Sequence, residues 1–445
     1  MILDKKIQYI LDTLNKYGYQ AYLVGGCVRD SLLNKTYTDI DISTNAHPQV
    51  VLSLFSNAMP TGMKQGTITL NVEGEEVEVT TFRKESNYKD HRHPESVEFV
   101  STIEEDLKRR DFTMNAIAYH PKTGFVDPFD GIKDIKNKQI RCVKDPNQCF
   151  EEDALRILRA YRFCAKLGFQ MEEKTKQAME KRKKDLKYIS NERIVQELTE
   201  ILRYNPYIIE QMTDLLGDWM PELEEAKKCE QNSRWHDSNV LHHSLRAVSY
   251  LKPFDSTLAW TLLMHDFGKM QAKETVDGMD HFKGHPEISA DIAQEYSKKI
   301  GFKKKDRDRM IQLIKYHDSS LSCSKKNIYN LCVSSQLDDM HMQNLFIIKR
   351  CDLLAHSILG RKTIHRLNKF IEYYDAFRKS HPLSLRELCI DGNDIKENTD
   401  LKQKQVHSAL NDCLKACIYE EVENDRQALI AYIKRFKQKW KDDKK

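Results

Sequence analysis

The chain has 445 residues and a formal net charge of +4, so it has room for roughly two to four domains, and no strong global field draws it to nucleic acid. Basic residues gather only locally, at 181–184, 303–305 and 434–445, where they can contact phosphates. The eleven cysteines include no Cys-x-x-Cys pair, and Cys413 and Cys417, one helical turn apart, suggest core packing more than a zinc site. No stretch approaches the roughly 20 apolar residues that span a bilayer. We therefore expect a soluble, cytoplasmic protein without a membrane partner.

Residues 1–43 predict a helix, a strand, a glycine turn, a second helix and a second strand. Apolar residues recur at helical spacing up to Gly18, and a short apolar run at 21–24 stops at Gly25-Gly26. Paired glycines after a strand let backbone N–H groups approach an anion, and the following helix adds its positive N-terminal end. This stretch therefore predicts a phosphate-binding turn.

Three charged residues complete this stretch. Arg29 can contact phosphate, and the second strand carries Asp39 and Asp41. Residues two apart on a strand point to one face, so both carboxylates can bind the same hard cation or a close pair of cations. Two metals that bridge attacking and leaving oxygens are the usual arrangement for nucleotidyl transfer.

The next segment predicts a hairpin and a loop. Two β-type runs, at 67–72 and 77–82, flank Glu73-Gly74-Glu75. Glu78 on the second run could supply a third carboxylate to the metal site, although alternating Glu and Val also fits a half-exposed strand. Residues 83–94 are polar without periodicity and predict a mobile loop.

Residues 104–118 predict an amphipathic helix that brings Arg110 to a triphosphate while Phe112 and Met114 pack inward. A second helix, at 152–162, carries Asp153, Arg156, Arg159 and Arg162 at steps of three, which form one slanting polar stripe.

This stripe can recognise a base. Asp153 can accept from an exocyclic amine while Arg156 donates to a ring nitrogen or carbonyl oxygen, so the pair reads both C and A and rejects bases without the amine. The same two residues also fit an ordinary i,i+3 ion pair on an exposed helix, worth a few tenths of a kcal/mol.

Five ordered motifs between residues 20 and 200 resemble those of the class II tRNA nucleotidyltransferases, the CCA-adding enzymes, and of bacterial poly(A) polymerases, within the polymerase-β superfamily. They are Gly25-Gly26-x-x-Arg29-Asp30 with Asp39-x-Asp41, Arg109-Arg110-Asp111-Phe112-Thr113-x-Asn115-Ala116, residues 127–131, Glu152-Asp153-x-x-Arg156, and residues 191–197. The resemblance implies addition of CCA to the 3′ end of tRNA from CTP and ATP, with tRNA as the partner and Mg²⁺ as the cofactor.

The resemblance also implies a role for each site residue. Asp39 and Asp41 would be catalytic and bind the metal, and Asp153 with Arg156 would select the nucleotide. The remaining nucleotide-binding residues would be Gly26, Arg29, Arg110, Arg159 and Arg162. Residues 83–94 match the flexible loop that the family needs to add the final A, and residues 191–197 would brace the selecting helix.

The character of the chain changes after residue 206. His243, His265-Asp266 and Asp352 occur in an order that resembles an HD-type phosphohydrolase domain, in which imidazole and carboxylate ligands hold an unidentified divalent metal that activates water. The same stretch also contains His281, His285 and His317.

We expect an α+β fold, with a polymerase-β-like head built on a small mixed sheet and all-α domains after it. The expected domains are a catalytic head at 1–145, a nucleotide-selecting neck at 146–215, an HD domain at 216–360 and a tRNA-binding C-terminal body at 361–445. Two alternatives remain: a poly(A) polymerase, or an HD phosphohydrolase whose head serves RNA binding. The intact Glu152-Asp153-x-x-Arg156 motif favours CCA addition.

Overall fold

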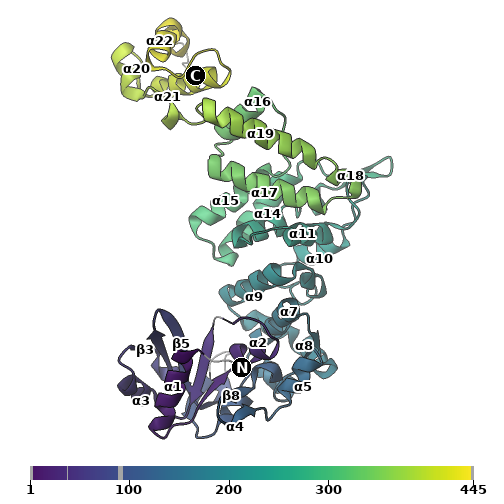
Figure 1. Ribbon diagram of the computed structural model, residues 1–445. Coiled ribbons are helices and arrows are strands. Elements are labelled where there is room, and N and C mark those ends of the chain that lie inside the picture. Colours follow the sequence, from purple (N-terminus) through teal and green to yellow (C-terminus); the bar gives the residue numbers. More distant parts are fainter. Residues whose placement is uncertain (1–3, 38, 89–93, 442–445) are drawn as a thin grey trace. The chain divides into compact units, whose positions relative to one another are not determined.

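The computed structural model describes residues 4–37, 39–88 and 94–441, and the chain divides into two compact units, Met1–Pro221 and Glu222–Lys445 (Figure 1). The first unit contains a mixed sheet and the second is almost entirely helical. The expected α+β architecture is therefore confirmed. A short hairpin of β12 (Glu274–Val276) and β13 (Met279–His281) interrupts the otherwise helical second unit.

A seven-stranded sheet in the order β3-β4-β5-β2-β1-β8-β9 forms the base of the first unit. Only β2 and β5 among these neighbours run parallel. The strands are β1 (Ala21–Val24), β2 (Ile40–Thr44), β3 (Ala58–Gly62), β4 (Thr67–Val72), β5 (Glu75–Thr81), β8 (Ala118–His120) and β9 (Gly124–Val126). The helices around it are α1 (Lys5–Lys16), α2 (Gly26–Leu32), α3 (Pro48–Leu54), α4 (Ile103–Lys108) and α5 (Gly131–Lys136).

Residues 83–88 and 94, which belong to the segment expected as a mobile loop, lie instead on two paired strands. Strands β6 (Arg83–Tyr88) and β7 (Pro94–Phe99) pair antiparallel, with Arg83 opposite Phe99. Residues 89–93 lie outside the described part of the chain. The prediction missed the strands because backbone hydrogen bonds define such a ribbon without requiring apolar alternation.

The helix expected at 104–118 is shorter than predicted. Helix α4 ends at Lys108, and a 3₁₀ turn follows at Thr113–Asn115. The backbone N–H of Thr113 donates to the carbonyl of Arg141 over 2.9 Å, and Phe112 forms a β-bridge with Cys142. Pairing with this distant segment replaces the helical hydrogen bonds, which sequence periodicity does not reveal.

The helix expected at 152–162 is interrupted at Asp153. Helix α6 (Pro146–Glu152) ends there, and α7 (Leu155–Leu167) begins two residues later. Asp153 has extended backbone geometry, and its Oδ1 accepts the N–H of Leu155 over 3.0 Å, as at a helix start. Asp153 is therefore a corner residue and does not belong to the helical stripe, whereas the three predicted arginines do lie on α7.

The rest of the first unit is helical. It comprises α8 (Glu173–Arg182), α9 (Asn191–Tyr204) and the 3₁₀ helices Lys183–Tyr188 and Pro206–Gln211, with a short parallel pair of β10 (Gln139–Ile140) and β11 (Gln170–Met171). The second unit contains α10 (Glu222–Lys228), α11 (Val240–Ser249), α12 (Ser256–Met264), α13 (Lys269–Ala272), α14 (His285–Ile300), α15 (Lys304–Tyr316), α16 (Lys325–Ile328), α17 (Asp339–Ala355), α18 (Ile358–Arg361), α19 (Ile364–Ser380), α20 (Gly392–Asn398), α21 (Gln403–Ile418) and α22 (Arg426–Lys441).

Helix α12 forms the core of its bundle. Every residue from Thr257 to Met264 is buried, as expected of a helix that is apolar on all sides. The residues that follow it, His265 and Asp266, are consequently buried as well. Over the described residues, no helix is long and apolar enough to cross a membrane.

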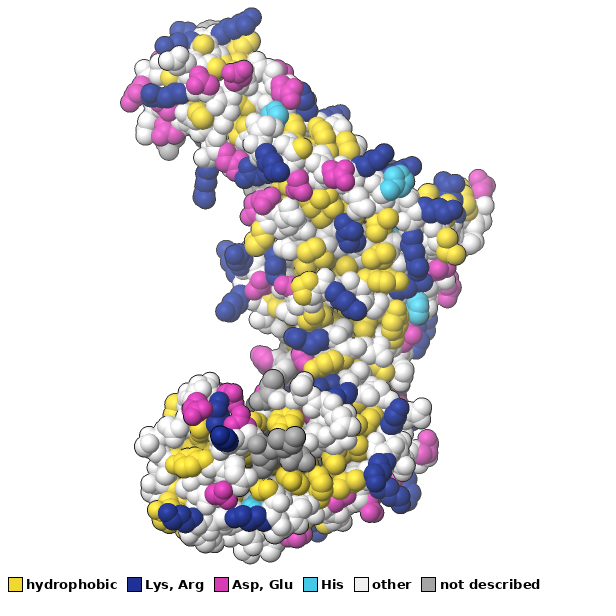
Figure 2. Space-filling model, in the orientation of Figure 1, with side chains coloured by type: hydrophobic (Ala, Val, Ile, Leu, Met, Phe, Trp, Pro, Cys, Tyr) yellow, Lys and Arg dark blue, Asp and Glu magenta, His cyan; other side chains and the backbone are white. Residues whose placement is uncertain are grey.

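The surface carries both signs of charge. On the face shown in Figure 2, Lys and Arg side chains are interspersed with Asp and Glu. This mixture agrees with the small net charge of the chain.

Candidate functional site

A cavity of about 570 Å³ in the first unit is lined by every residue predicted for catalysis and nucleotide binding. The sheet supplies Asp41, the preceding segment Asp39, and the turn after β1 supplies Gly26 and Arg29. The others that line it are Arg110, Asp153, Arg156, Arg159 and Arg162. Residues up to 168 positions apart in the sequence thus converge on one space, since Gly25 and Arg193 both line it.

The carboxylates gather around β2. Asp41 lies on β2 and pairs in register with Glu78 of β5, whereas Asp39 directly precedes the strand and is not part of it. Burial raises the pKa of Asp41, Arg110 opposes this rise, and Asp39 adds to it. The pKa of Glu78 is raised as well, mainly because the side chain is partly buried and also because the negative charges of Asp41 and Asp39 lie nearby.

This donor set fits a hard divalent cation. The carboxylates disfavour one another's charged forms, and a cation among them would relieve that repulsion. Their ligand atoms are all oxygens, which suits Mg²⁺.

The glycine turn lies directly against this group. Gly25 has φ +73°, and a Cβ there would approach Arg110 Nη1 to 3.0 Å and Asp41 Oδ2 to 3.3 Å. Arg110 is positioned from behind by the fully buried Asp106, whose Oδ2 lies 3.4 Å from Arg110 Nη2. The turn therefore needs glycine at position 25, because a side chain there would displace the Arg110 guanidinium and the Asp41 carboxylate.

Three guanidinium groups surround the ring of Phe163. The Cζ atoms of Arg29, Arg159 and Arg162 lie 5.2, 5.7 and 4.5 Å from its centroid. Arg29 is itself buried and pairs with Asp30 over 2.7 Å. The aromatic face helps three like charges to remain together at the cavity wall.

Asp153 and Arg156 each pair with a different partner. Asp153 Oδ2 lies 2.9 Å from Arg193 Nη2, and Arg156 Nη1 lies 3.0 Å from Glu152 Oε2. Arg156 also donates to the carbonyl of Arg109 over 3.1 Å. The alternative of an i,i+3 ion pair between Asp153 and Arg156 is wrong, because the corner at Asp153 turns its carboxylate toward α9.

Helix α9 braces the cavity wall. Besides Arg193, it supplies Glu197, whose Oε2 accepts from Arg162 Nε over 2.6 Å. Arg159 pairs over 2.6 Å with Asp111. Burial favours a raised pKa for Asp111, but Arg159 and several hydrogen bonds outweigh it and hold the pKa well below its usual range.

Several lining residues received no individual role from the sequence. Asp111, Asn115 and Arg193 stand inside the quoted motifs, which was the signal that could have identified them. Phe163 gave no such signal in the sequence, because an aromatic residue on an amphipathic helix ordinarily belongs to the hydrophobic core. The lining residues without a predicted role include Arg83, Arg109, Asp111, Asn115, Phe163, Lys166 and Arg193.

A second site lies in the second unit, where the four predicted ligands of the HD motif converge. His243 comes from α11, His265-Asp266 from the end of α12, and Asp352 from α17. His243 Nε2 lies 2.9 Å from Asp352 Oδ1 and 3.5 Å from Asp266 Oδ2. His265 Nε2 lies 3.3 Å from Asp266 Oδ2 and 3.6 Å from Asp352 Oδ1.

The charges of this group are strongly coupled. Burial favours a low pKa for His265, but Asp266 and Asp352 outweigh it and raise the pKa to about 10. Burial lowers the pKa of His243 to about 4, although Asp352 and Asp266 act against it. Two carboxylates and two imidazoles that converge on one position form a ligand set that suits a divalent transition metal.

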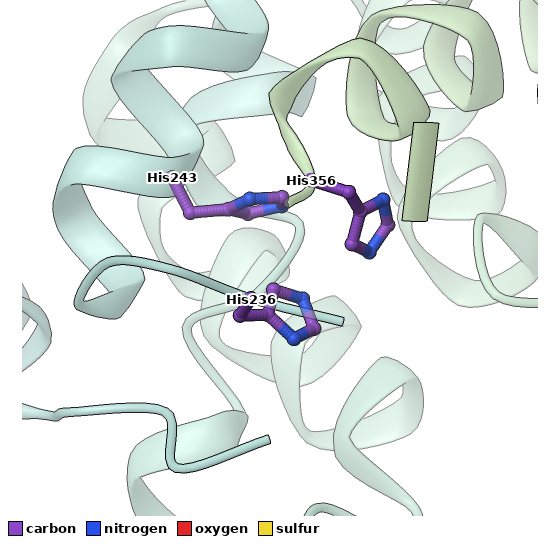
Figure 3. A group of neighbouring side chains, drawn as sticks. All are labelled: His236, His243 and His356. Atoms are coloured by element: carbon purple, nitrogen blue, oxygen red, sulfur yellow. The ribbon is translucent and has the colours of Figure 1, made fainter. Parts of the chain in front are cut away.

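The second site holds more histidines than the sequence assigned. His285 and His317 lie against Asp266, and His236 and His356 lie beside His243. Figure 3 shows His236, His243 and His356, which come from the segment before α11, from α11 and from the end of α17. A cavity of about 380 Å³ opens here, lined by His236, Asp266, His285, His317, Asp352 and His356 among others.

Comparison with family models finds three matches in this chain. Residues 21–141 match the poly A polymerase head domain, residues 168–226 match a probable RNA and SrmB-binding site of polymerase A, and residues 236–334 match the HD domain. Asp352 lies beyond the HD match.

The curated relatives are CCA-adding enzymes. One from Lactobacillus helveticus is 48% identical over 196 residues, which cover 44% of this chain and 49% of that protein. One from Geobacillus thermodenitrificans is 40% identical over 270 residues, which cover 59% and 63%. These matches span about half to just under two thirds of the relatives' length.

Solved structures extend the likeness over the whole chain. The Bacillus stearothermophilus CCA-adding enzyme in complex with CTP matches 99% of this chain and 100% of its own, at TM-score 0.74 and 25% identity. The Thermotoga maritima CCA-adding enzyme complexed with tRNA shares the fold, at TM-score 0.56, 18% identity and coverage of 98% and 96%. The chain is therefore similar to CCA-adding enzymes in sequence and over its whole length in fold, and it carries matches to the poly A polymerase head domain and the HD domain.

Proposed function

We propose that this protein adds CCA to the 3′ end of tRNA from CTP and ATP, without a nucleic-acid template and with release of pyrophosphate. One observation carries this proposal: a single cavity holds the carboxylates of β2, the glycine turn and the arginines of α7. The relatives found by comparison are CCA-adding enzymes, so the poly(A) polymerase alternative is not favoured.

Asp39 and Asp41 would hold the catalytic metal. When bound there, two Mg²⁺ ions would activate the tRNA 3′-hydroxyl and stabilise the charge of the triphosphate. Gly26, Arg29 and Arg110 would hold the phosphates in line with the attacking oxygen. That oxygen forms a bond to the α-phosphorus as the bond to pyrophosphate breaks.

The corner between α6 and α7 would select the nucleotide. Asp153 would accept from the exocyclic amine of C or A, and Arg156 would donate to the adjoining ring edge. Arg193 contacts Asp153 at 2.9 Å, and Glu152 contacts Arg156 at 3.0 Å. These contacts support the proposal that the two side chains are already in place to recognise the edge of a base before the nucleotide binds. Arg159 and Arg162 would make further nucleotide contacts, and the helices after residue 146 would grip tRNA by its shape and backbone.

A second activity would belong to the HD domain. The convergence of His243, His265, Asp266 and Asp352 beside a cavity favours a metal-dependent phosphohydrolase that repairs the phosphorylated 3′ ends of tRNA. All eleven cysteines are free thiols, which supports a reducing, cytoplasmic location for both activities.

Two variants of the full chain separate these activities. Asp39→Ala with Asp41→Ala should lose nucleotide addition while keeping phosphate release from tRNA with cyclic or 2′-phosphate ends. His265→Ala should do the reverse. Nucleotide addition that survives loss of both head carboxylates would contradict the proposed catalytic site, whereas phosphate release that survives His265→Ala would contradict only the second activity.

A further inference from the structure

One buried carboxylate contacts three of the arginines that line the cavity of the first unit. Asp106 of α4 has no exposed surface, whereas Arg83, Arg109 and Arg110 all line the cavity. Its Oδ1 accepts the backbone N–H of Arg83 over 3.3 Å and Nε of Arg109 over 2.9 Å. Its Oδ2 accepts from Arg110 Nη2 over 3.4 Å. Asp106 does not itself line the cavity, so it can affect a bound ligand only through these arginines.

Ser43 joins this group to the strand of the proposed metal ligands. It lies on β2 two residues after Asp41, so the two side chains point to the same face of the sheet. The buried Ser43 Oγ donates to Asp106 Oδ2 over 3.2 Å and accepts from Arg110 Nη2 over 3.4 Å. Arg110 is therefore held by two groups, one of which fixes it relative to Asp41.

These contacts leave most of the Arg110 guanidinium available. Among the described residues, its hydrogen bonds run through Nη2, and its Nε is buried without a partner. Its Nη1 stands 3.0 Å from the position that a Cβ on Gly25 would take, beside the glycine turn. A guanidinium with five N–H donors that is held through one nitrogen can present the others to an anion at that turn.

The charge of Asp106 is maintained by its partners. Burial favours a raised pKa for Asp106, but Arg109 and Arg110 outweigh it and lower the pKa. A buried ion pair adds little net stability, because lost hydration offsets the attraction between the charges. The main consequence of this arrangement is therefore the position of the arginines.

Arg109 extends the arrangement to the residues proposed to select the nucleotide. Its Nε pairs with Asp106 over 2.9 Å, and its carbonyl oxygen accepts from Arg156 Nη2 over 3.1 Å. The proposed phosphate contact, Arg110, and the proposed base contact, Arg156, are thus both connected to the same buried carboxylate.

We propose that Asp106 is a positioning residue for nucleotidyl transfer, which holds Arg110 in place for the triphosphate of the incoming CTP or ATP. The proposal rests on the function proposed above for the first unit. Asp106 acts through the arginines and touches no substrate. Loss of its charge would let the Arg110 side chain leave the glycine turn, and the hold on the triphosphate would weaken.

The substitution Asp106→Asn tests this role through the direction of its effect. Removing a negative charge beside the cavity would by itself strengthen the binding of an anion. We predict the opposite: Kd and KM for CTP rise about tenfold because Arg110 is misplaced, while KM for tRNA stays within about twofold. Binding of CTP with Mg²⁺ is measured by calorimetry in the full chain with His265→Ala, so that the HD site does not contribute.

A double-mutant cycle shows whether Asp106 acts through Arg110. In an Arg110→Ala background, Asp106→Asn should weaken CTP binding by no more than about twofold further. Tighter or unchanged CTP binding by Asp106→Asn alone, or an equal tenfold loss with and without Arg110, would overturn the proposal. A chain that binds CTP as predicted but adds no nucleotide would contradict the proposed function and still support the role of Asp106.

Asp134→Asn is the matched control. Asp134 is also buried and pairs with an arginine, Arg141, over 2.8 Å, but neither residue lines the cavity. It should leave the Kd for CTP within about twofold. Circular dichroism establishes that each variant is folded. If Asp106→Asn is not folded, Ser43→Ala removes one contact of the same group and should raise the Kd for CTP about threefold, an effect that disappears without Arg110.

Discussion

At the residue scale, Gly25 controls how closely the glycine turn approaches Asp41, one of the two proposed catalytic carboxylates. We predict that Gly25→Ala lowers kcat/KM for nucleotide addition by on the order of 100-fold, because the new Cβ displaces Arg110 and Asp41. Gly74→Ala is the control, since Gly74 also has positive φ but a Cβ there meets nothing within 4 Å. Steady-state kinetics should separate the two, and equal loss of activity would refute a steric effect at the site.

A second prediction at this scale concerns Phe163, whose aromatic ring lies beside three arginines of the cavity wall. Replacing it by Leu removes the aromatic face shared by Arg29, Arg159 and Arg162, so we predict that KM for CTP and ATP rises roughly tenfold with a smaller change in kcat. Phe169→Leu, a buried position that does not line the cavity, controls for lost packing. Fluorinated phenylalanines at 163 should raise KM in step with the weakening of the ring's negative face, and an unchanged KM across that series would exclude the cation–π role.

At the element scale, α9 holds in place the corner at Asp153 that we propose selects the nucleotide. Arg193→Ala frees Asp153 from its 2.9 Å partner, so we predict that discrimination of CTP and ATP against UTP and GTP falls by roughly tenfold while tRNA binding is kept. Arg182→Ala is the control, because Arg182 pairs with the exposed Glu151 on the adjacent helices. Relative kcat/KM values for the four nucleotides report the effect, which should be absent in the control.

The elements also differ in how far sequence predicted them. Helix α1 and strands β1 and β4 follow their periodicity closely, because each buries a simple apolar face. The corner at Asp153 and the early end of α4 escaped prediction, since contacts with Arg193 and with residues 141–142 determine them. Motif order picked out residues that line one cavity, whereas periodicity misplaced Asp39 and Asp153 on regular elements.

The ion-pair partners of the site residues were the feature hardest to predict from the sequence. Arg156 pairs with Glu152 and Arg159 with Asp111, and the second of these joins residues 48 apart in the sequence. Likewise, His285 and His317 could be read as histidines of the HD region but not as neighbours of Asp266. Such pairings depend on how helices pack, which a single sequence does not encode locally.

At the scale of the whole molecule, a transition metal bound by the histidines and carboxylates of the HD domain should stabilise the second unit. A transition metal at 100 times its dissociation constant adds about 2.7 kcal/mol to the free energy of unfolding, or roughly 5–10 °C in a unit of this size. Calorimetry of the full chain with Mn²⁺ should show this shift, and His265→Ala should abolish it. The Asp39→Ala and Asp41→Ala variant should keep it, and a shift lost there would place the ion in the first unit.

The product of the reaction tests the central claim most directly. Purified protein is incubated with Mg²⁺ and tRNA lacking its 3′ end, with CTP alone, ATP alone or both, and the products are sequenced. The account predicts CC with CTP alone, CCA with both nucleotides, no further growth, and no extension by the Asp39→Ala and Asp41→Ala variant. A long A tail, or extension that persists in that variant, would contradict it.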